Sequence, residues 1–258
     1  KKTQFFSSRF VGKTDKIIVG KSKSKKLLST SSMTTADASK YTIADQPLRF
    51  ANGKKENNTR MLDIDAVYDG SCLKGKRVLV TGANRGIGLA LAKELNDKGA
   101  FILGTCRKTS DDLSALSNTQ VIENCEITDE KSIANAFKEI TEPVDIVINN
   151  AGVIRRGPIT EATDDDYAAS FAVNVEAPFR ICRAAIPILA EASGGAIVNV
   201  ASCWGVHPGP NHPIYCMSKA AVASMTQCLG RDHAHQGIRI NAVCPNEVDT
   251  PMLRSGFA

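Results

Sequence analysis

Three residues in the second half of the chain have types and spacing suited to proton transfer. Tyr215 precedes Lys219 by four residues, and Ser202 lies thirteen residues before the tyrosine. A helix here would place the phenol and the amine on one face, one turn apart. A phenol is a weak acid or base near neutrality, and a neighbouring ammonium lowers its pKa by favouring the phenolate. Ser202 could hydrogen-bond an oxygen on which charge develops. The set predicts proton transfer at a substrate oxygen.

A glycine-rich turn, TGANRGIG at 81–88, follows the short apolar segment 77–80. Apolar residues at Ile87, Leu91 and Leu95 then have the spacing of one helix face. Glycines allow the backbone to approach a pyrophosphate, and a helix N-terminus offers free N–H groups and the positive end of a dipole. Glycine also serves tight turns and close packing, but the strand–turn–helix context favours a dinucleotide. The residues predicted to bind it in this turn are Thr81, Gly82, Asn84, Arg85, Gly86, Ile87 and Gly88.

The residues after the second expected strand (100–105) bear on the choice of cofactor. NAD sites usually place an acid there to hold the ribose 2′-hydroxyl, whereas this chain has Cys106, Arg107 and Lys108. Arg85 adds a further cation, and a guanidinium suits a 2′-phosphate. We therefore predict NADP(H) as the preferred cofactor, bound in part by Arg107, with NAD(H) as the alternative. The competing interpretation is that Arg107 and Lys108 are solvated loop charges.

Apolar strands alternate with helical patterns from about residue 76 onward. This alternation predicts a Rossmann-like, doubly wound parallel sheet in a three-layer α/β/α arrangement. The expected strands are 77–80, 100–105, 120–125, 144–149, 196–201 and 238–244. The expected helices are 86–98, 111–116, 129–140, 164–192 and 214–235. We expect Thr128 to cap the third helix and Pro187 to bend the fourth.

Taken together, these motifs resemble those of the short-chain dehydrogenase/reductase family. TGANRGIG resembles that family's cofactor turn, and NNAG at 149–152 resembles its segment after the fourth strand. Asn174 in FAVNVEAPF joins Ser202, Tyr215 and Lys219 in the family's tetrad, and RINAVCPNEVDTPM at 239–252 resembles the strand and loop that hold the nicotinamide. The resemblance implies the interconversion of a ketone or aldehyde and an alcohol by hydride transfer. A narrower hypothesis is an activity like that of a 3-oxoacyl-carrier-protein reductase. The alternative is a non-catalytic nucleotide-binding sensor or scaffold, which would be free to lose Tyr215 or Lys219.

The resemblance also implies a role for each matching residue. Tyr215 is the general acid/base, Lys219 tunes it and holds the nicotinamide ribose, Ser202 positions the carbonyl, and Asn174 anchors a water in a proton relay. The cofactor residues implied outside the glycine turn are Glu126 near the adenine, Asn150, Ala151 and Gly152 on the adenosine-ribose side, and Pro245, Val248 and Thr250 around the nicotinamide. Two structural alternatives stand beside these roles: Asn174 as a helix-kink residue and Thr250 as an N-cap.

The chain departs from the family pattern at three places. Glu126 stands where the family often has an aspartate, and Asn246 replaces the usual glycine after Pro245. The family also continues with a substrate-covering helix and a further strand, which are absent before Ala258. We therefore expect a C-terminally truncated member with an unpaired sheet edge and a pocket open on one side.

The charge of the chain is unevenly distributed. Residues 1–36 hold nine Lys/Arg and one acid, a net +8, so the remainder carries −3 of the total +5. A basic nucleic-acid-binding face on the folded part is therefore not expected. We predict a disordered leader at 1–70 and an NAD(P)-binding catalytic domain at 71–258. Residues 1–36 resemble an organellar transit segment, for a plastid or mitochondrion. The alternative is a tail without an address and a cytoplasmic protein.

The eight cysteines of the chain are scattered, and no C-x-x-C pair occurs. We therefore predict no metal site and a reducing compartment. No apolar run reaches membrane-spanning length, so no membrane association is expected. The expected partner is a small-molecule carbonyl or alcohol substrate. The family resemblance further implies a homodimer or homotetramer built on the helices at 164–192 and 214–235.

Overall fold

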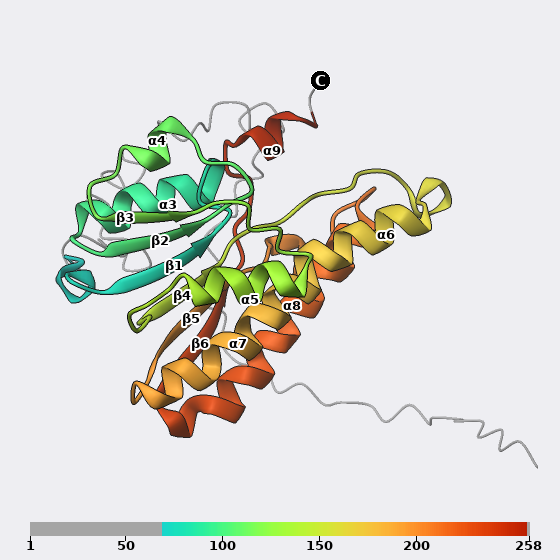
Figure 1. Ribbon diagram of the computed structural model, residues 1–258. Coiled ribbons are helices and arrows are strands. Elements are labelled where there is room, and N and C mark those ends of the chain that lie inside the picture. The colour runs from blue at the N-terminus through green and yellow to red at the C-terminus, as the bar shows by residue number, and fades with distance from the viewer. Residues whose placement is uncertain (1–68, 257–258) are drawn as a thin grey trace, which may run out of the picture. The chain divides into compact units, whose positions relative to one another are not determined.

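The computed structural model of the protein describes residues 69–256, and in these residues a six-stranded parallel sheet forms the centre. The strand order is β3-β2-β1-β4-β5-β6 (Figure 1). The strands are β1 (Arg77–Thr81), β2 (Phe101–Thr105), β3 (Thr119–Ile122), β4 (Ile146–Asn149), β5 (Gly195–Val200) and β6 (Ile238–Val243). The doubly wound α/β fold predicted from the sequence is confirmed. The predicted leader lies outside the described residues, apart from its last two.

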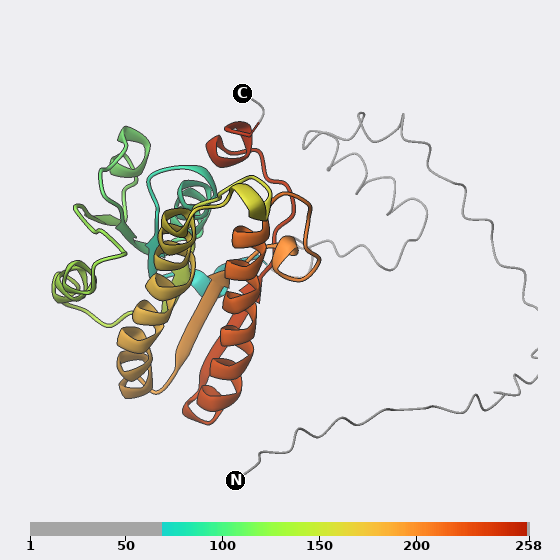
Figure 2. The same ribbon diagram turned by 90° about the vertical axis from the view of Figure 1, so that its right-hand side faces the viewer.

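Helices cover both faces of the sheet. They are α3 (Gly86–Asp97), α4 (Asp111–Ser114), α5 (Glu130–Lys138), α6 (Asp164–Phe171), α7 (Ala177–Glu191), α8 (Pro213–His233) and α9 (Pro251–Arg254). Figure 1 shows α3 and α4 over one face and α5, α7 and α8 over the other, and Figure 2 shows α7 and α8 from the side. No helix in the described part of the chain is long and apolar enough to cross a membrane.

Two apolar cores follow from the two-residue period of the strands. Val78 and Val80 point to the face of α3 and α4, where they pack with Ile102. Leu79, between them, points to the opposite face and packs with Ile197 beneath α5 and α7. Both faces of β1 are therefore buried, which explains why its sequence is a continuous apolar run rather than an alternating one.

The N-cap expected for α5 was one residue early. Asp129 caps the helix, because its carboxylate accepts a hydrogen bond from Lys131 N at 2.9 Å. The Thr128 hydroxyl instead donates to Glu126 Oε1 at 3.0 Å. The third strand also ends earlier than expected, at Ile122, because the backbone turns at Asn124, whose φ is 55°. Asparagine tolerates this left-handed conformation better than most residues.

The long helix expected at 164–192 is interrupted at Asn174, the alternative kink residue, and not at Pro187. A π-helical turn at Ala172–Glu176 separates α6 from α7, whereas Pro187 lies inside α7. Such wide turns are rare and often occur at functional sites. Asn174 lies in this turn and is buried, so the irregularity coincides with a residue of the predicted catalytic set.

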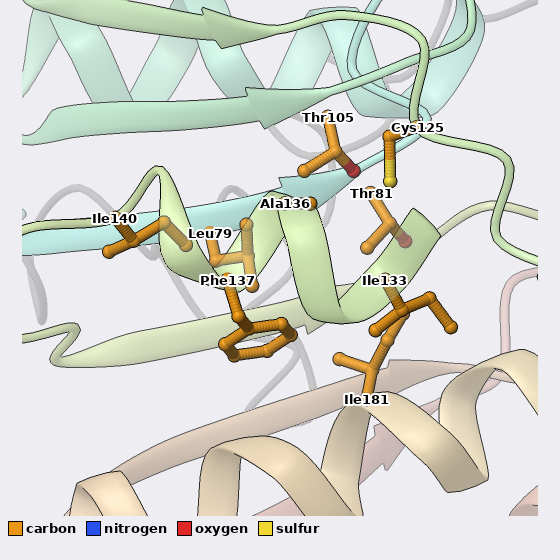
Figure 3. Close-up of a pocket in the computed structure, with 9 residues that line it drawn as sticks. All are labelled: Leu79, Thr81, Thr105, Cys125, Ile133, Ala136, Phe137, Ile140 and Ile181. Atoms are coloured by element: carbon orange, nitrogen blue, oxygen red, sulfur yellow. The ribbon is translucent and has the colours of Figure 1, made fainter. Parts of the chain in front are cut away.

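The described part of the structure contains a small cavity and a wide groove. A cavity of about 10 Å³ between α5 and the sheet has room for about one water molecule (Figure 3). It is lined by Leu79, Thr81, Thr105, Cys125, Ile133, Ala136, Phe137, Ile140 and Ile181. A groove of about 780 Å³ runs along β6 and α8, where β6 pairs only with β5 among the described strands. The cavity is too small for a substrate.

Candidate active site

The predicted site residues gather at the carboxyl ends of β1, β4 and β5. This is where open α/β sheets bind ligands, at the point where the strand order reverses between β1 and β4. Thr81 and Asn150 join the two strands there. The Thr81 hydroxyl accepts hydrogen bonds from the N–H groups of Asn150 and Ala151, both at 3.0 Å, and Asn150 Nδ2 donates to Thr81 O at 2.9 Å. These residues therefore hold the carboxyl ends of β1 and β4 together.

The glycine turn has the geometry of an anion-binding loop. Gly82 and Gly86 adopt φ values of 65° and 55°, which side chains disfavour. A Cβ at Gly88 would lie 2.1 Å from Gly82 O, so this glycine is required for the turn to pack on itself. Arg85 occupies the N-cap position of α3 without a capping hydrogen bond from its side chain. The first N–H groups of α3 are thus left for an anion, which fits the pyrophosphate of a dinucleotide.

The expected ribose end of the cofactor site carries a mixed charge. Asn84 Nδ2 donates to Lys108 O at 2.8 Å and ties the glycine turn to the loop after β2. Arg107 Nη1 lies 3.8 Å from Glu126 Oε2, so the cation predicted for the 2′-phosphate is partly balanced by the acid predicted for the adenine. Arg85 is exposed and forms no ion pair with another described residue. Of the two arginines, Arg85 therefore presents the less compensated charge.

Ser202, Tyr215 and Lys219 converge beside the end of β5. Ser202 Oγ accepts a hydrogen bond from Trp204 N at 3.1 Å and lies within hydrogen-bonding reach of the Tyr215 side chain. Lys219 is buried, its Nζ donates to Val200 O at 2.7 Å, and the same atom lies 5.9 Å from the centre of the Tyr215 ring. The structure therefore brings together the three residues that the sequence singled out for proton transfer.

The pKa of Tyr215 moves in the opposite direction to the one predicted. Burial raises it above 10.0, while the hydrogen bond with Ser202 and the positive charge of Arg156 act to lower it. Burial also lowers the pKa of Lys219 from 10.5 to about 8. Desolvation is the largest cause of the raised Tyr215 pKa, and the Lys219 ammonium is not among the groups that lower it. In the protein alone, Tyr215 is therefore a phenol that keeps its proton near neutrality.

Asn174 links the catalytic helix to the loop after β4. Its Oδ1 accepts from Val153 N at 2.8 Å, and its Nδ2 donates to Val153 O at 2.9 Å and to Ser218 Oγ at 3.0 Å. Ser218 Oγ in turn donates to Tyr215 O at 2.8 Å. A Cβ at Gly152 would lie 3.2 Å from Asn174 Oδ1 and 3.4 Å from Lys219 Nζ. Asn174 is thus both the helix-irregularity residue and a neighbour of the catalytic set, and its water-anchoring role stays a prediction.

The loop after β6 crosses from the catalytic residues to the glycine turn. Pro245 O accepts from Cys203 N at 2.9 Å, next to Ser202. Thr250 caps α9 by accepting from Leu253 N at 3.3 Å, and its methyl group lies 3.6 Å from the position of a Cβ at Gly86. Val248 O accepts from the Thr250 hydroxyl at 3.2 Å. The N-cap alternative for Thr250 is therefore correct, and the same residue also lies over the cofactor turn.

Two residues near Tyr215 did not emerge from the sequence. Trp204 packs against His212, with ring centres 4.4 Å apart, and meets Tyr215 edge-on at 6.3 Å. Arg156 lies on the loop after β4 and contributes to the charge around Tyr215. The signals that could have identified them are the only tryptophan of the chain, two residues after Ser202, and the paired arginines just after NNAG. Within residues 69–256, no cluster of His, Cys, Asp or Glu is arranged to hold a metal ion.

Comparison with known proteins gives consistent similarities. The family model of short chain dehydrogenases matches residues 76–258. Oxidoreductase UcpA of Escherichia coli K12 is 32% identical over 192 residues, which cover 71% of this chain and 73% of that protein. The 3-oxoacyl-[acyl-carrier-protein] reductase FabG of Haemophilus influenzae is 31% identical over 188 residues, or 70% of this chain and 77% of the reductase. A crystal structure of a candidate NAD(P)-dependent gluconate 5-dehydrogenase from Beutenbergia cavernae, with NADP bound at low occupancy, has a TM-score of 0.68 and 29% identity and covers 71% of this chain and 76% of its own.

Proposed function

The chain belongs to the short-chain dehydrogenase family, and we propose that it interconverts a ketone or aldehyde and the corresponding alcohol with NADP(H). At the level of the family it is an NAD(P)-dependent oxidoreductase. The observation that carries the proposal is the convergence of Ser202, Tyr215 and Lys219 at the end of β5, together with the uncapped N-terminus of α3 after β1. When bound, the nicotinamide would supply or accept the hydride.

The protein's own contribution is to hold the substrate oxygen and to move a proton to it. The Ser202 and Tyr215 hydroxyls together could hydrogen-bond a carbonyl oxygen. As that oxygen gains negative charge it becomes a much stronger base than the phenolate, so the Tyr215 proton is transferred to it downhill. Because burial raises the pKa of Tyr215, the proton-bearing form that reduction needs is present at neutral pH. Tyr215 can therefore donate a proton to the developing alkoxide near neutrality.

Preference for NADP(H) over NAD(H) is part of the proposal. Support comes from Cys106, which stands where an acid would repel a 2′-phosphate, and from the exposed guanidinium of Arg85 at the start of α3. The ion pair between Arg107 and Glu126 weakens the contribution of Arg107. Arg85 is accordingly the residue that we expect to make the larger contact with the 2′-phosphate.

A narrower candidate function is that of a 3-oxoacyl-carrier-protein reductase. The similarity to the Haemophilus influenzae reductase favours it. Turnover of an acetoacetyl thioester with NADPH, at a kcat/KM above that of simple ketones, is the result that this candidate requires. A rate no better than that of the ketones would reject it without affecting the broader proposal.

Oxidation of NADPH by the purified full-length chain, followed with a panel of ketones and aldehydes, tests the broader proposal. We expect turnover of at least one carbonyl class, and slower turnover with NADH. Tight NADPH binding with no turnover of any carbonyl or alcohol would instead point to a nucleotide-binding sensor or scaffold.

We also propose that the protein works as a homodimer or homotetramer in the cytoplasm. Helices α6, α7 and α8 expose large apolar side chains, among them Tyr167, Phe179 and Met217. A subunit interface would bury them, which supports assembly through these helices. Import into an organelle is the alternative. It would depend on residues 1–36, which lie outside the described part of the chain. Light scattering and the location of a fluorescent fusion to the full chain test the two statements.

A further inference from the structure

Arg156 is a cation near Tyr215 for which the described residues supply no carboxylate partner. It lies on the loop between β4 and α6 and is exposed. Its Nη2 donates to Met252 O at 3.0 Å, and its Nη1 donates to Ser255 Oγ at 3.4 Å, so the guanidinium reaches across to α9. It forms no ion pair with any residue in the described range. A guanidinium has five N–H donors, so donors remain for another ligand.

The neighbouring charges are already paired with each other. Arg155, the preceding residue, lies 3.0 Å from an oxygen of Asp166. Just before α9, Asp249 accepts hydrogen bonds from Arg254 Nε and Nη2, both at 2.7 Å. Neither carboxylate is therefore available to neutralise Arg156. Two adjacent arginines thus differ: Arg155 is held in an ion pair, whereas Arg156 has none within the described residues and contacts α9.

The backbone next to Arg156 is joined to the loop that precedes Tyr215. The next residue, Gly157, donates its N–H to Asn211 O at 2.8 Å, and Asn211 lies four residues before Tyr215. The charge of Arg156 also acts on the Tyr215 phenol and lowers its pKa. A substrate whose oxygen is held by Tyr215 and Ser202 could therefore extend a second group toward Arg156.

We infer that Arg156 binds a carboxylate of the substrate, so that the enzyme acts on oxo acids and hydroxy acids. The planar fork of arginine matches a carboxylate, and a charge-assisted pair at a site mouth is stronger than a neutral hydrogen bond. The simpler role, a latch that holds α9, explains the contact with Met252 O but needs no charge. This inference rests on the proposed carbonyl reduction and specifies its substrate class.

Matched substrates test it in the full-length enzyme. The wild type, Arg156→Gln and Arg156→Lys are compared on pyruvate and pyruvamide, acetoacetate and acetoacetamide, and levulinate and levulinamide, each with NADPH. We expect the wild type to prefer at least one acid over its amide. We also expect Arg156→Gln to lower kcat/KM for that acid by about 10- to 100-fold, mostly through a higher KM. The kcat/KM for the matching amide should change by less than about 3-fold. Arg156→Lys should recover part of the loss.

Arg155→Gln is the matched control, because it removes the same charge one residue away from a side chain paired with Asp166. It should leave the preference between acid and amide unchanged. Equal losses on acids and amides in Arg156→Gln, or a wild type without any preference for acids, would overturn the inference and leave Arg156 as the latch. The NADPH affinity and melting temperature of Arg156→Gln show whether the variant is folded. If the enzyme turned over no carbonyl substrate, whether acid or neutral, the proposed function itself would be refuted.

Discussion

Lys219 shows that a residue suited to catalysis can be unfavourable for stability. Its ammonium is buried, with Val200 O as its hydrogen-bond acceptor, and burial lowers its pKa to about 8. A buried charge without a nearby counter-ion opposes folding, and active sites commonly retain such groups because the chemistry needs them. The sequence identified this lysine from its spacing to Tyr215, but the direction of the pKa shifts depends on burial, which spacing does not reveal.

Replacing Lys219 by methionine should stabilise the protein while abolishing activity. At pH 7 we expect a gain of about 2 kcal/mol in unfolding free energy, since removing the buried charge gains about 3 kcal/mol and losing the bond to Val200 O costs about 1 kcal/mol. Between pH about 8 and 10.5 the folded wild type loses this proton while the unfolded chain keeps it. The wild type therefore becomes more stable with rising pH in this window. The difference in unfolding free energy between the variant and the wild type closes accordingly. Urea unfolding at several pH values measures this, and a destabilised variant at pH 7 would contradict it.

Arg85 and Arg107 should contribute unequally to cofactor choice. Arg107 is partly balanced by Glu126, whereas Arg85 has no such partner in the described structure. We expect Arg85→Gln to reduce the ratio of kcat/KM for NADPH over NADH by about 10-fold or more, equivalent to about 1.4 kcal/mol. Arg107→Gln should reduce it less. The same ratio measured in both variants decides the order, and a larger effect at Arg107 would reverse our assignment.

At the scale of elements, the sequence predicted a helix or turn correctly where its contacts join residues close in the chain. It was less successful where those contacts join distant residues. The glycine turn and the start of α3 at Gly86 follow from residues that are close in the chain. The π-helical turn at Ala172–Glu176 does not, because Asn174 is held there by Val153 and Ser218, which lie 21 and 44 residues away. From local rules the sequence predicted a bend at Pro187, and it offered a kink at Asn174 only as the alternative to a catalytic role.

The N-cap of α5 allows a test that leaves the active site untouched. Asp129→Ala removes the side chain that accepts from Lys131 N. We expect the unfolding free energy to fall by about 1 kcal/mol, with kcat/KM unchanged. Thr128→Ala serves as the comparison, since the Thr128 hydroxyl bonds Glu126 and not the helix backbone. Denaturant unfolding of both variants measures the difference. A larger loss of unfolding free energy in Thr128→Ala would show that Thr128 is the N-cap, as the sequence suggested.

For the molecule as a whole, the alternation of strands and helices was sufficient to predict a doubly wound sheet. The order of its strands places the ends of β1, β4 and β5 together, and this convergence makes one site from residues more than 100 positions apart, such as Gly86 and Ser202. The role of Arg156 depends on that convergence and on the path of the loop after β6. The paired arginines after NNAG mark the position in the sequence, but only the folded structure shows which of the two lacks an ion pair.

Activity of Tyr215→Phe on the best carbonyl substrate, measured beside its NADPH affinity, tests the central claim most directly. Phenylalanine keeps the ring but removes the hydroxyl that donates the proton. We predict a loss of at least about 100-fold in kcat, with the dissociation constant for NADPH unchanged within about 3-fold. A variant that reduces the same carbonyl at close to the wild-type rate would show that the proton comes from elsewhere and would contradict the account.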